Sequence, residues 1–128
     1  MPQDFWDYLD KLVDSHPLVI ERPVGSRHPR YPEVVYPLDY GYLEGTTSID
    51  KGGIDVWLGT KDRESCKRAK INSVQAVICS VDLKKNDVEI KIVLNCRESE
   101  IQTILAFQND KMMRAILIRR PNIIKETT

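Results

Sequence analysis

Residues 74–94, Val74-Gln-Ala-Val-Ile-Cys-Ser-Val-Asp82-Leu-Lys-Lys-Asn-Asp87-Val-Glu-Ile-Lys-Ile-Val-Leu94, form the most regular stretch of this chain. Two apolar runs, residues 74–81 and 88–94, flank a mainly polar connection of six residues, which predicts two strands joined as a hairpin. Successive side chains of a strand point to opposite faces. Glu89 and Lys91 are therefore expected on the face opposite the apolar one.

Shorter elements are predicted on both sides of this hairpin. Apolar residues at helical spacing predict an amphipathic helix over residues 3–14 and a second helix over 99–108. Extended segments are expected at 18–21, 34–36 and 54–58, with a closing strand at 112–118. Residues 61–70 read as a solvated charged connection, and the tail from Pro121 is expected to fray. Short strands, few helices and no repeated βαβ pattern favour a small, mostly antiparallel barrel with flanking helices.

The composition limits the possible functions. A chain of 128 residues, 41% hydrophobic, is expected to form one domain over 1–128. Lys plus Arg and Asp plus Glu both number 19, so no net charge attracts nucleic acid or a membrane surface. The three cysteines have no metal-binding spacing and are interpreted as free thiols. With neither a signal-like N-terminus nor a long apolar stretch, the prediction is a cytoplasmic protein.

Carboxylates suggest where the chemistry lies. Asp50, Asp55, Asp82 and Asp87 stand at turns or strand ends, and oxygen donors without His or Cys companions suit Mg²⁺. Each feature also has a purely structural interpretation. Asp residues at a hairpin stem commonly accept hydrogen bonds from turn amides. Tyrosines at every second position commonly pack a barrel, and the Arg/His loop at 27–30 reads equally well as solvated surface. Composition alone leaves the function open.

Three motifs, in order and spacing, resemble the soluble Mg-dependent inorganic pyrophosphatases: Val19-Ile-Glu-Arg-Pro23, Tyr36-Pro-Leu-Asp-Tyr-Gly-Tyr42 and Ser48-Ile-Asp-Lys-Gly-Gly-Ile-Asp-Val56. The resemblance covers about residues 18–94 and extends more loosely to 118. It implies a mainly β (α+β) fold, an OB-like five-stranded antiparallel barrel with flanking N-terminal and C-terminal helices. It also implies that the barrel mouth binds Mg²⁺ and pyrophosphate, that metal-activated water is the nucleophile, and that the protein forms a homo-oligomer.

The resemblance also implies roles for individual residues. Asp50 and Asp55 match metal ligands and, with Tyr40, are the expected catalytic residues; Asp82 and Asp87 match the second pair of metal ligands. The expected substrate-binding residues are Glu21, Arg30 and Tyr36, with Lys91 and Arg27 as substitutes for missing cations.

The chain departs from the family where catalysis needs it most. Gly52 stands where the family has the carboxylate that acts as general base, and Lys51 beside it adds a positive charge. Loss of a positioned general base typically removes about 10² to 10⁴ in rate. Glu89 replaces a phosphate-binding lysine, and Phe107-Gln108 replaces a Tyr-Lys pair.

Two hypotheses follow from these matches and departures. The first is Mg-dependent hydrolysis of pyrophosphate with reduced activity. The second is a non-catalytic relative that binds metal or a phosphate ligand. A groove for single-stranded nucleic acid, a third option, is disfavoured by the zero net charge and the acidic mouth.

Overall fold

A computed structural model describes residues 2–48, 51–62 and 73–121. The chain is α+β and mainly β. Its elements, in order, are α1 (Pro2–Asp14), β1 (Leu18–Arg22), β2 (Asp39–Leu43), β3 (Ile54–Leu58), β4 (Val74–Asp82), β5 (Asp87–Leu94), α2 (Glu98–Gln108) and β6 (Met113–Arg119). Neither helix is long and apolar enough to cross a membrane within the ranges described.

The strands form one six-stranded sheet in the order β1-β2-β3-β5-β4-β6. All neighbouring pairs are antiparallel except β3 and β5, which run parallel. The expected five-stranded antiparallel barrel is therefore wrong in strand number and in the direction of one pair. The reason is that β4 pairs with both β5 and β6, so the free edge of β5 is left for β3. Among the described residues, β1 and β6 are the two edges and do not pair with each other.

One strand lies later in the chain than the sequence predicts. An extended segment was expected at 34–36, but the paired strand is β2, and Val35 forms only an isolated bridge with Arg27. Pro37 has no N–H to donate, so regular pairing starts only beyond it. Every other predicted helix and strand agrees with the structure to within one residue at each end. The charged connection at 61–70 and the C-terminal tail lie almost wholly outside the described residues.

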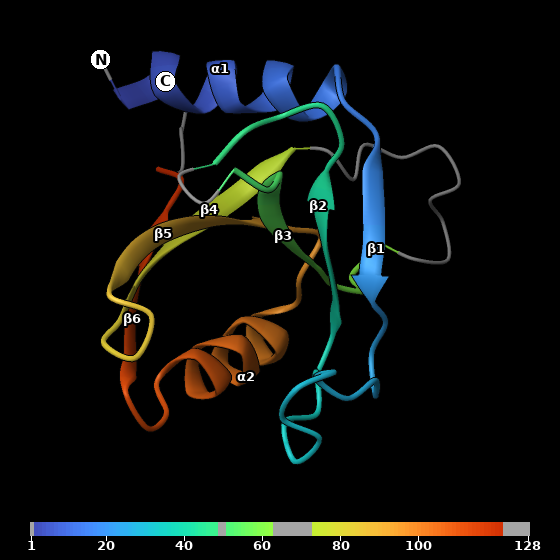
Figure 1. Cartoon of the computed structure of the whole chain (residues 1–128). Helices are drawn as coiled ribbons and strands as arrows, with labels where there is room; N and C mark the ends of the chain where they lie inside the picture. The colour runs from blue at the N-terminus through green and yellow to red at the C-terminus, as the bar shows by residue number, and fades with distance from the viewer. Residues whose placement is uncertain (1, 49–50, 63–72, 122–128) are drawn as a thin grey trace.

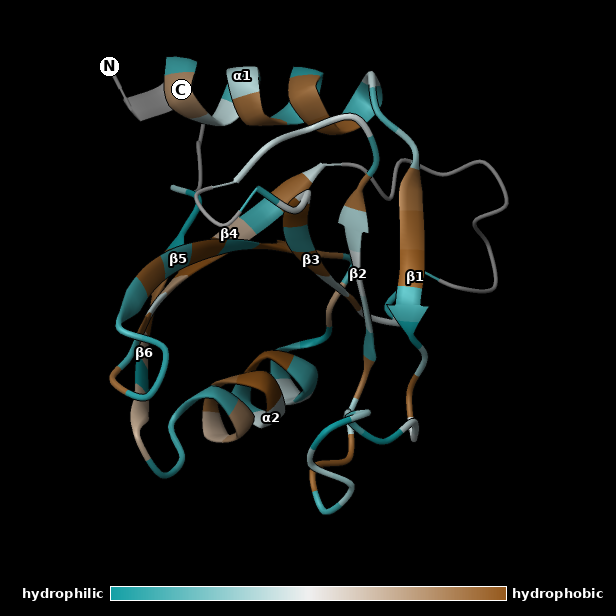
Figure 2. Ribbon diagram, in the orientation of Figure 1, coloured by the Kyte–Doolittle hydropathy of each residue, from teal (hydrophilic) through white to brown (hydrophobic). Residues whose placement is uncertain are grey.

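Both faces of the sheet are covered in part (Figure 1). α1 lies on one face, where Trp6 and Val13 pack with buried residues of the strands, Leu43, Val56, Val74, Val77, Ile92 and Leu94. The sheet curves over α2 on the other face, where Ile101 and Ile104 pack with Tyr36, Leu38, Trp57, Ala76, Ile78, Val93 and Cys96. Figure 2 shows this division as apolar strands between two helices, with hydrophilic residues interrupting β5.

The alternation expected for β5 is present, but the charged face is the buried one in the first half of the strand. Glu89 and Lys91 do lie opposite the apolar residues, but they face the α2 side, and Lys91 is only 5% exposed. Val88 and Ile90 on the other face are 59% and 53% exposed, because α1 covers only the part of that face near Ile92. Charge inside and apolar side chains outside is unusual for a strand. It therefore points to a specific role for both features.

The described cysteines, Cys79 and Cys96, are free thiols, and Cys66 lies outside the described residues. Burial raises the pKa of the Cys96 thiol to about 12. A thiol with such a pKa is protonated and unreactive near neutral pH.

Candidate functional site

Strand register brings a lysine and two carboxylates together on the α2 side of the sheet. Asp55 of β3 lies opposite Lys91 of β5 in the parallel pair. Glu89 precedes Lys91 by two residues and therefore shares its face. Tyr40 of β2 lies opposite Trp57, which is two residues beyond Asp55 on β3. We call Lys91, Asp55, Glu89 and Tyr40 the Lys91 cluster.

The ammonium group of Lys91 is bound by both carboxylates. Its Nζ lies 2.8 Å from Oε1 of Glu89 and 3.2 Å from Oδ2 of Asp55. It also lies 5.6 Å from the ring centroid of Tyr40, within reach of a cation–π interaction. The Lys91 and Glu89 side chains are only 7% and 10% exposed. The ion pair of Lys91 and Glu89 is therefore almost excluded from solvent, while Asp55, at 29% exposed, is only partly buried.

Protonation in this cluster follows from burial and charge. Burial acts to lower the pKa of Lys91, but interactions with Tyr40, Asp55 and Glu89 outweigh it, so the pKa is raised above its ordinary value. Burial also raises the pKa of the Tyr40 phenol. Near neutral pH, Lys91 is therefore a cation and Tyr40 is uncharged. Tyr40 was an expected catalytic residue, yet a phenol with a raised pKa is a poor base.

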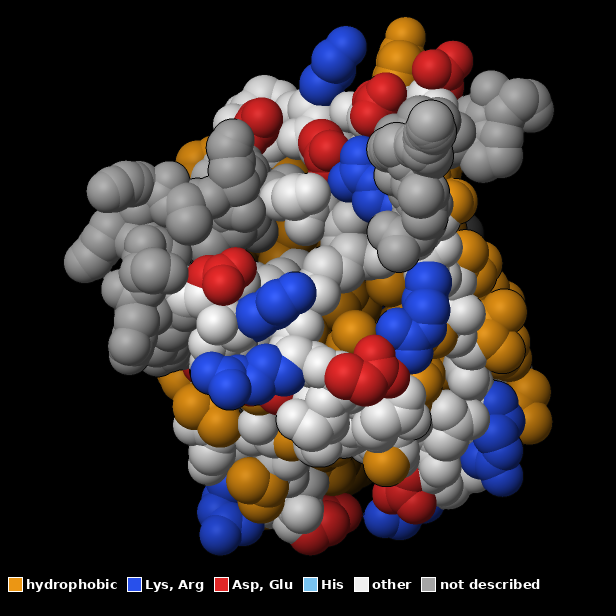
Figure 3. All heavy atoms as spheres, turned by 180° about the vertical axis from the view of Figure 1, so that it is seen from behind, with side chains coloured by type: hydrophobic (Ala, Val, Ile, Leu, Met, Phe, Trp, Pro, Cys, Tyr) orange, Lys and Arg blue, Asp and Glu red, His pale blue; other side chains and the backbone are white. Residues whose placement is uncertain are grey.

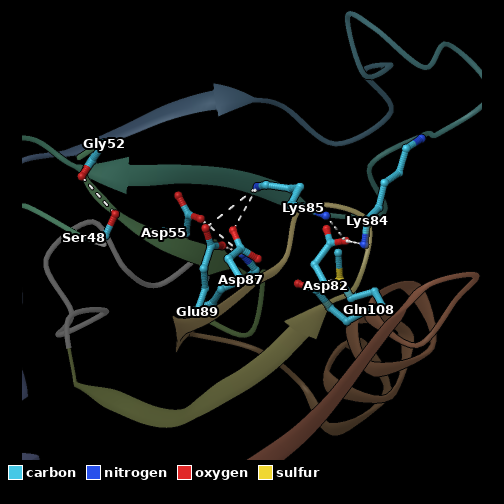
Figure 4. Close-up of polar contacts among 11 residues, drawn as sticks. Ser48, Gly52, Asp55, Asp82, Lys84, Lys85, Asp87, Glu89 and Gln108 are labelled. Atoms are coloured by element: carbon cyan, nitrogen blue, oxygen red, sulfur yellow. Dashed lines mark hydrogen bonds and ion pairs between the residues drawn. The ribbon is translucent and has the colours of Figure 1, made fainter. Parts of the chain in front are cut away.

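A second lysine extends the ion-pair group toward the β4–β5 hairpin (Figure 4). Lys85 Nζ lies 3.7 Å from Asp87 and 3.9 Å from Glu89. Asp82 lies opposite Asp87 in the register, but its Oδ1 accepts the backbone N–H groups of Lys84 and Lys85 at 2.9 and 3.1 Å. This geometry agrees with the purely structural interpretation of Asp82, in which a hairpin-stem carboxylate accepts hydrogen bonds from turn amides.

The remaining expected metal ligand, Asp50, lies outside the described residues. Gly52, at the position of the missing general base, follows an exposed Lys51 with φ 70°. Its carbonyl accepts a hydrogen bond from the Ser48 hydroxyl at 3.1 Å. The turn at residues 51–53 therefore supplies no carboxylate in place of the missing general base.

Tyr36, an expected substrate-binding residue, and the two residues that replace the family's Tyr-Lys pair are part of the core. Tyr36 is 8% exposed, and its ring lies 5.4 Å from both Tyr40 and Phe107. Gln108 is buried and accepts a hydrogen bond from the indole N–H of Trp57 at 3.1 Å. The positions that match the family's Tyr-Lys pair therefore stabilise α2 against the sheet.

The expected basic and acidic residues at the N-terminal end are spread along β1 and the following loop. Glu21 is exposed and lies 4.0 Å from its neighbour Arg22. Arg27 donates to the carbonyl of Pro32 at 2.8 Å, which holds the loop closed. Arg30 is exposed on the same loop. Asp39, which the sequence analysis did not single out, accepts the N–H of Val24 at 2.8 Å and anchors the loop to β2.

The described donors do not fit the Mg²⁺ centre that the resemblance implies. Within residues 2–48, 51–62 and 73–121, no three His, Cys, Asp or Glu side chains are arranged to hold a metal ion. The two carboxylates nearest each other across β3 and β5 already share the Lys91 ammonium. A metal ion at those oxygens would have to displace Lys91 or lie against it.

Comparison with solved structures shows what this fold resembles. An inorganic pyrophosphatase from Neisseria gonorrhoeae matches 80% of this chain and 81% of its own, with 18% sequence identity and a TM-score of 0.55. A structure described as an inorganic phosphatase from Anaplasma phagocytophilum matches 83% of this chain and 77% of its own, with 14% identity and a TM-score of 0.44, too low to support an argument. No family model and no curated protein matches the sequence. The chain thus has a pyrophosphatase-like fold, and its chemistry has to be argued from its own residues.

Sequence reasoning found part of this site. The period-two pattern correctly placed Glu89 and Lys91 on one face of β5. The pattern did not show that this face is buried. Burial of a strand face depends on where α1 and α2 pack, and the strand's own sequence does not contain that information. Lys84 and Lys85 of the hairpin were passed over as ordinary turn residues.

Proposed function

We propose that this chain, as a single domain over residues 1–128, is a non-catalytic protein of pyrophosphatase-like fold that binds pyrophosphate or a related phosphate anion. One observation carries the proposal: the Lys91 ammonium is bound by Glu89 and by Asp55, which the resemblance implies as a metal ligand. The fold likeness supports a phosphate ligand, and the cation in the mouth argues against metal-dependent turnover.

The reasoning is electrostatic. Lys91 Nζ lies 3.2 Å from Oδ2 of Asp55, an expected Mg²⁺ ligand, and 2.8 Å from Oε1 of Glu89. Two unit positive charges 4 Å apart repel by about 4 kcal/mol at an effective dielectric constant of 20, and a divalent ion by about twice that. With Lys85 beside Asp87 and Glu89, two ammonium groups offset two of the three carboxylates Asp55, Asp87 and Glu89, which reduces the negative charge that would repel an anion.

The direct test is calorimetric titration of the protein with pyrophosphate in excess EDTA. We expect saturable binding without metal, with an affinity that falls as salt is added, because the attraction is electrostatic. An absence of binding in EDTA, with binding restored by Mg²⁺, would contradict the proposal and favour a metal-dependent site.

The second candidate is Mg-dependent hydrolysis of pyrophosphate. It is supported by Asp55, on β3 beside β5, and by Asp82 and Asp87, which lie opposite each other in the β4–β5 register. In this case Gly52→Asp should raise phosphate release by about 10² or more, since it restores a general base. Gly52→Asn is the matched control without a charge.

We also propose that the protein forms a homo-oligomer through the exposed apolar face of β4, β5 and β6. The register aligns Ile90, Cys79 and Ile116 in one row across the three strands, and Val88 and Val81 in the next. Four of these side chains, and Ile118 beside them, are 43–62% exposed. Seen from behind, the molecule shows hydrophobic side chains along the side where β5 and β6 lie (Figure 3). A second copy is the occupant we favour, because β6 also offers a free strand edge.

The partners and the location that the sequence predicts are kept as part of this proposal. A net charge of zero remains the reason to expect no binding to nucleic acid or membranes. The cytoplasmic location also remains a prediction.

A further inference from the structure

A single histidine nitrogen holds the turn at residues 29–32, in the loop between β1 and β2. Nδ1 of His28 accepts the backbone N–H groups of Arg30 and Tyr31 at 3.0 and 3.2 Å. Within the ranges that the structure describes, neither N–H group donates to a backbone carbonyl. The other two residues of the turn are prolines, which have no N–H group. The ring nitrogen is therefore the acceptor for both backbone donors of this turn.

The base of the same loop is closed without the histidine ring. The backbone N–H of Tyr36 donates to the carbonyl of Ser26 at 2.9 Å, and that of Gly25 donates to the carbonyl of Tyr36 at 2.8 Å. The backbone N–H of His28 itself donates to the carbonyl of Val34 at 2.9 Å. Loss of the ring's hydrogen bonds would therefore free the turn and leave the base of the loop in place.

The turn contacts the β4–β5 hairpin through one aromatic ring. The ring of Tyr31 lies 5.1 Å from that of His28, between centroids, and 4.5 Å from Nζ of Lys84, on the hairpin. Lys84 extends away from the carboxylates that Lys85 contacts (Figure 4). A cation over an aromatic face at this distance is attracted to it. By fixing the turn, His28 thus keeps the Tyr31 ring beside Lys84.

Protonation of the His28 ring would reverse the role of Nδ1. In the neutral ring the proton is assigned to Nε2, because Nδ1 faces two donors. In the imidazolium cation both nitrogens carry hydrogen and neither can accept. A protonated Nδ1 would therefore point its own N–H at two N–H groups that it can no longer bind.

The groups around the ring favour its neutral form. Burial, followed by Arg22 of β1 and by Arg30, lowers the pKa of His28 from its ordinary value of 6.5. Lys85 of the hairpin acts in the same direction, and Glu33 of the loop opposes them. In a released turn the ring would regain its ordinary pKa, so the released form binds the proton more readily. A fall in pH through the ordinary value therefore favours release.

We propose that His28 is a pH-dependent switch: its neutral ring holds the turn at residues 29–32 against the β4–β5 hairpin, and protonation of Nδ1 in mild acid releases the turn. One proton from solvent occupies the Nδ1 lone pair, and the two backbone N–H groups then donate to water. The switch needs no phosphate ligand, so it goes beyond the proposed function and does not depend on it. Because the turn carries Arg30, release also frees this cation from its fixed place beside the hairpin.

The second histidine of the chain is an internal control. Nδ1 of His16 lies 2.9 Å from the carbonyl oxygen of Leu12, on α1. A carbonyl oxygen can only accept, so this Nδ1 is a donor in the neutral ring and in the cation alike. Acid should therefore leave the contact between His16 and Leu12 in place while it breaks both contacts of the His28 ring.

The first experiment is an NMR titration of the wild-type protein from about pH 8 to about pH 5, a range in which most carboxylates stay ionised. The amide signals of Arg30 and Tyr31 should shift with the same midpoint as the His28 ring, and their exchange with water, corrected for pH, should rise about tenfold. The NOE between Tyr31 and Lys84 should disappear in acid. Amide signals that stay constant while the His28 ring titrates, or an NOE that persists in acid, would overturn the proposal.

Two substitutions of His28 separate the acceptor from the titration. His28→Asn supplies a side-chain oxygen that accepts nearby backbone N–H groups and does not titrate, so the NOE should persist at every pH. His28→Phe keeps a ring beside Tyr36, whose centroid lies 6.4 Å from that of His28, but removes the acceptor. This variant should lack the NOE at every pH.

Thermal melts check that both variants are folded, and the wild-type titration decides the case if either is not. Loss of the NOE from folded His28→Asn in acid, as in the wild type, would assign the pH response to another group and overturn the proposal.

Discussion

Lys91 is the residue on which the chemistry of this protein depends. It is buried between Asp55 and Glu89, whereas the resemblance to pyrophosphatases led us to expect it as a substitute for a phosphate-binding lysine. The burial of Glu89 depends on Lys91. Burying the Glu89 carboxylate, where the family has a phosphate-binding lysine, would cost free energy without the Lys91 ammonium two residues later.

Lys91→Met is expected to destabilise the protein by about 3–5 kcal/mol, because it leaves Asp55 and Glu89 together without a compensating charge. Urea unfolding measures the change. Mg²⁺ should stabilise this variant and have little effect on the wild type, since removal of the ammonium frees the carboxylates. Lys85→Met is the control: its side chain is 58% exposed, so a loss of about 1 kcal/mol or less is expected. Equal stability of Lys91→Met and wild type would contradict this account.

Stability should also fall at high pH. The folded-state pKa of Lys91 is raised, so its contribution is complete below the unfolded value of about 10.4 and is lost as the pH rises toward the folded value. Tyr40 acts in the same direction from about pH 10, because its neutral form is favoured in the folded state. Urea unfolding between about pH 8 and about pH 11, which spans the unfolded pKa values of Lys and Tyr, should show this decline in stability. A Lys91→Met/Tyr40→Phe double variant should decline less steeply; identical profiles would refute the assignment.

The strands show which parts of the fold the sequence could predict. Every helix, and every strand except β2, followed from apolar periodicity and turn residues, because these signals are local. β2 was missed since its Tyr-Gly-Tyr centre, after two prolines, has little strand character of its own. Its pairing with β1 and β3 is what stabilises it, and such contacts are not visible in one stretch of sequence. The same holds for the parallel β3–β5 pair and for the buried charges of β5.

Gly41, in the middle of β2, permits the close approach of β1. A Cβ at this position would lie 2.8 Å from the Cα of Ile20 and even closer to the carbonyl oxygen of Val19. Gly41→Ala should therefore separate the two strands and cost about 3 kcal/mol or more in unfolding free energy. Glu44→Ala, exposed just beyond the same strand, should change stability by about 0.5 kcal/mol or less. Equal urea midpoints for the two variants would contradict the claim that β1 and β2 approach too closely at Gly41 to accommodate a Cβ atom.

The whole molecule exposes an apolar face on β4, β5 and β6 and is expected to self-associate through it. Ile116→Lys, in the centre of that face, should shift sedimentation velocity profiles to a smaller species. Val24→Lys is the control, because Val24 is 59% exposed on the loop after β1 and outside the face. A wild-type protein that sediments as a monomer at high concentration would contradict the proposed oligomer.

The sequence identified several residues of the candidate site but not the contacts between them. Asp55, Asp82, Asp87 and Lys91 were identified from the sequence, and the structure places them on β3 and on the hairpin of β4 and β5. Their roles could not be read from the sequence, because a salt bridge between β3 and β5 depends on a parallel register that no local pattern shows.

The most direct test of the account is phosphate release from pyrophosphate by the wild-type protein with excess Mg²⁺, compared with an EDTA control and with Asp55→Ala. Because Lys91 holds Asp55 and Glu89 and Gly52 supplies no base, we predict no release above the EDTA control. Release that requires Mg²⁺ and is lost in Asp55→Ala would contradict the central claim and identify the protein as a working hydrolase.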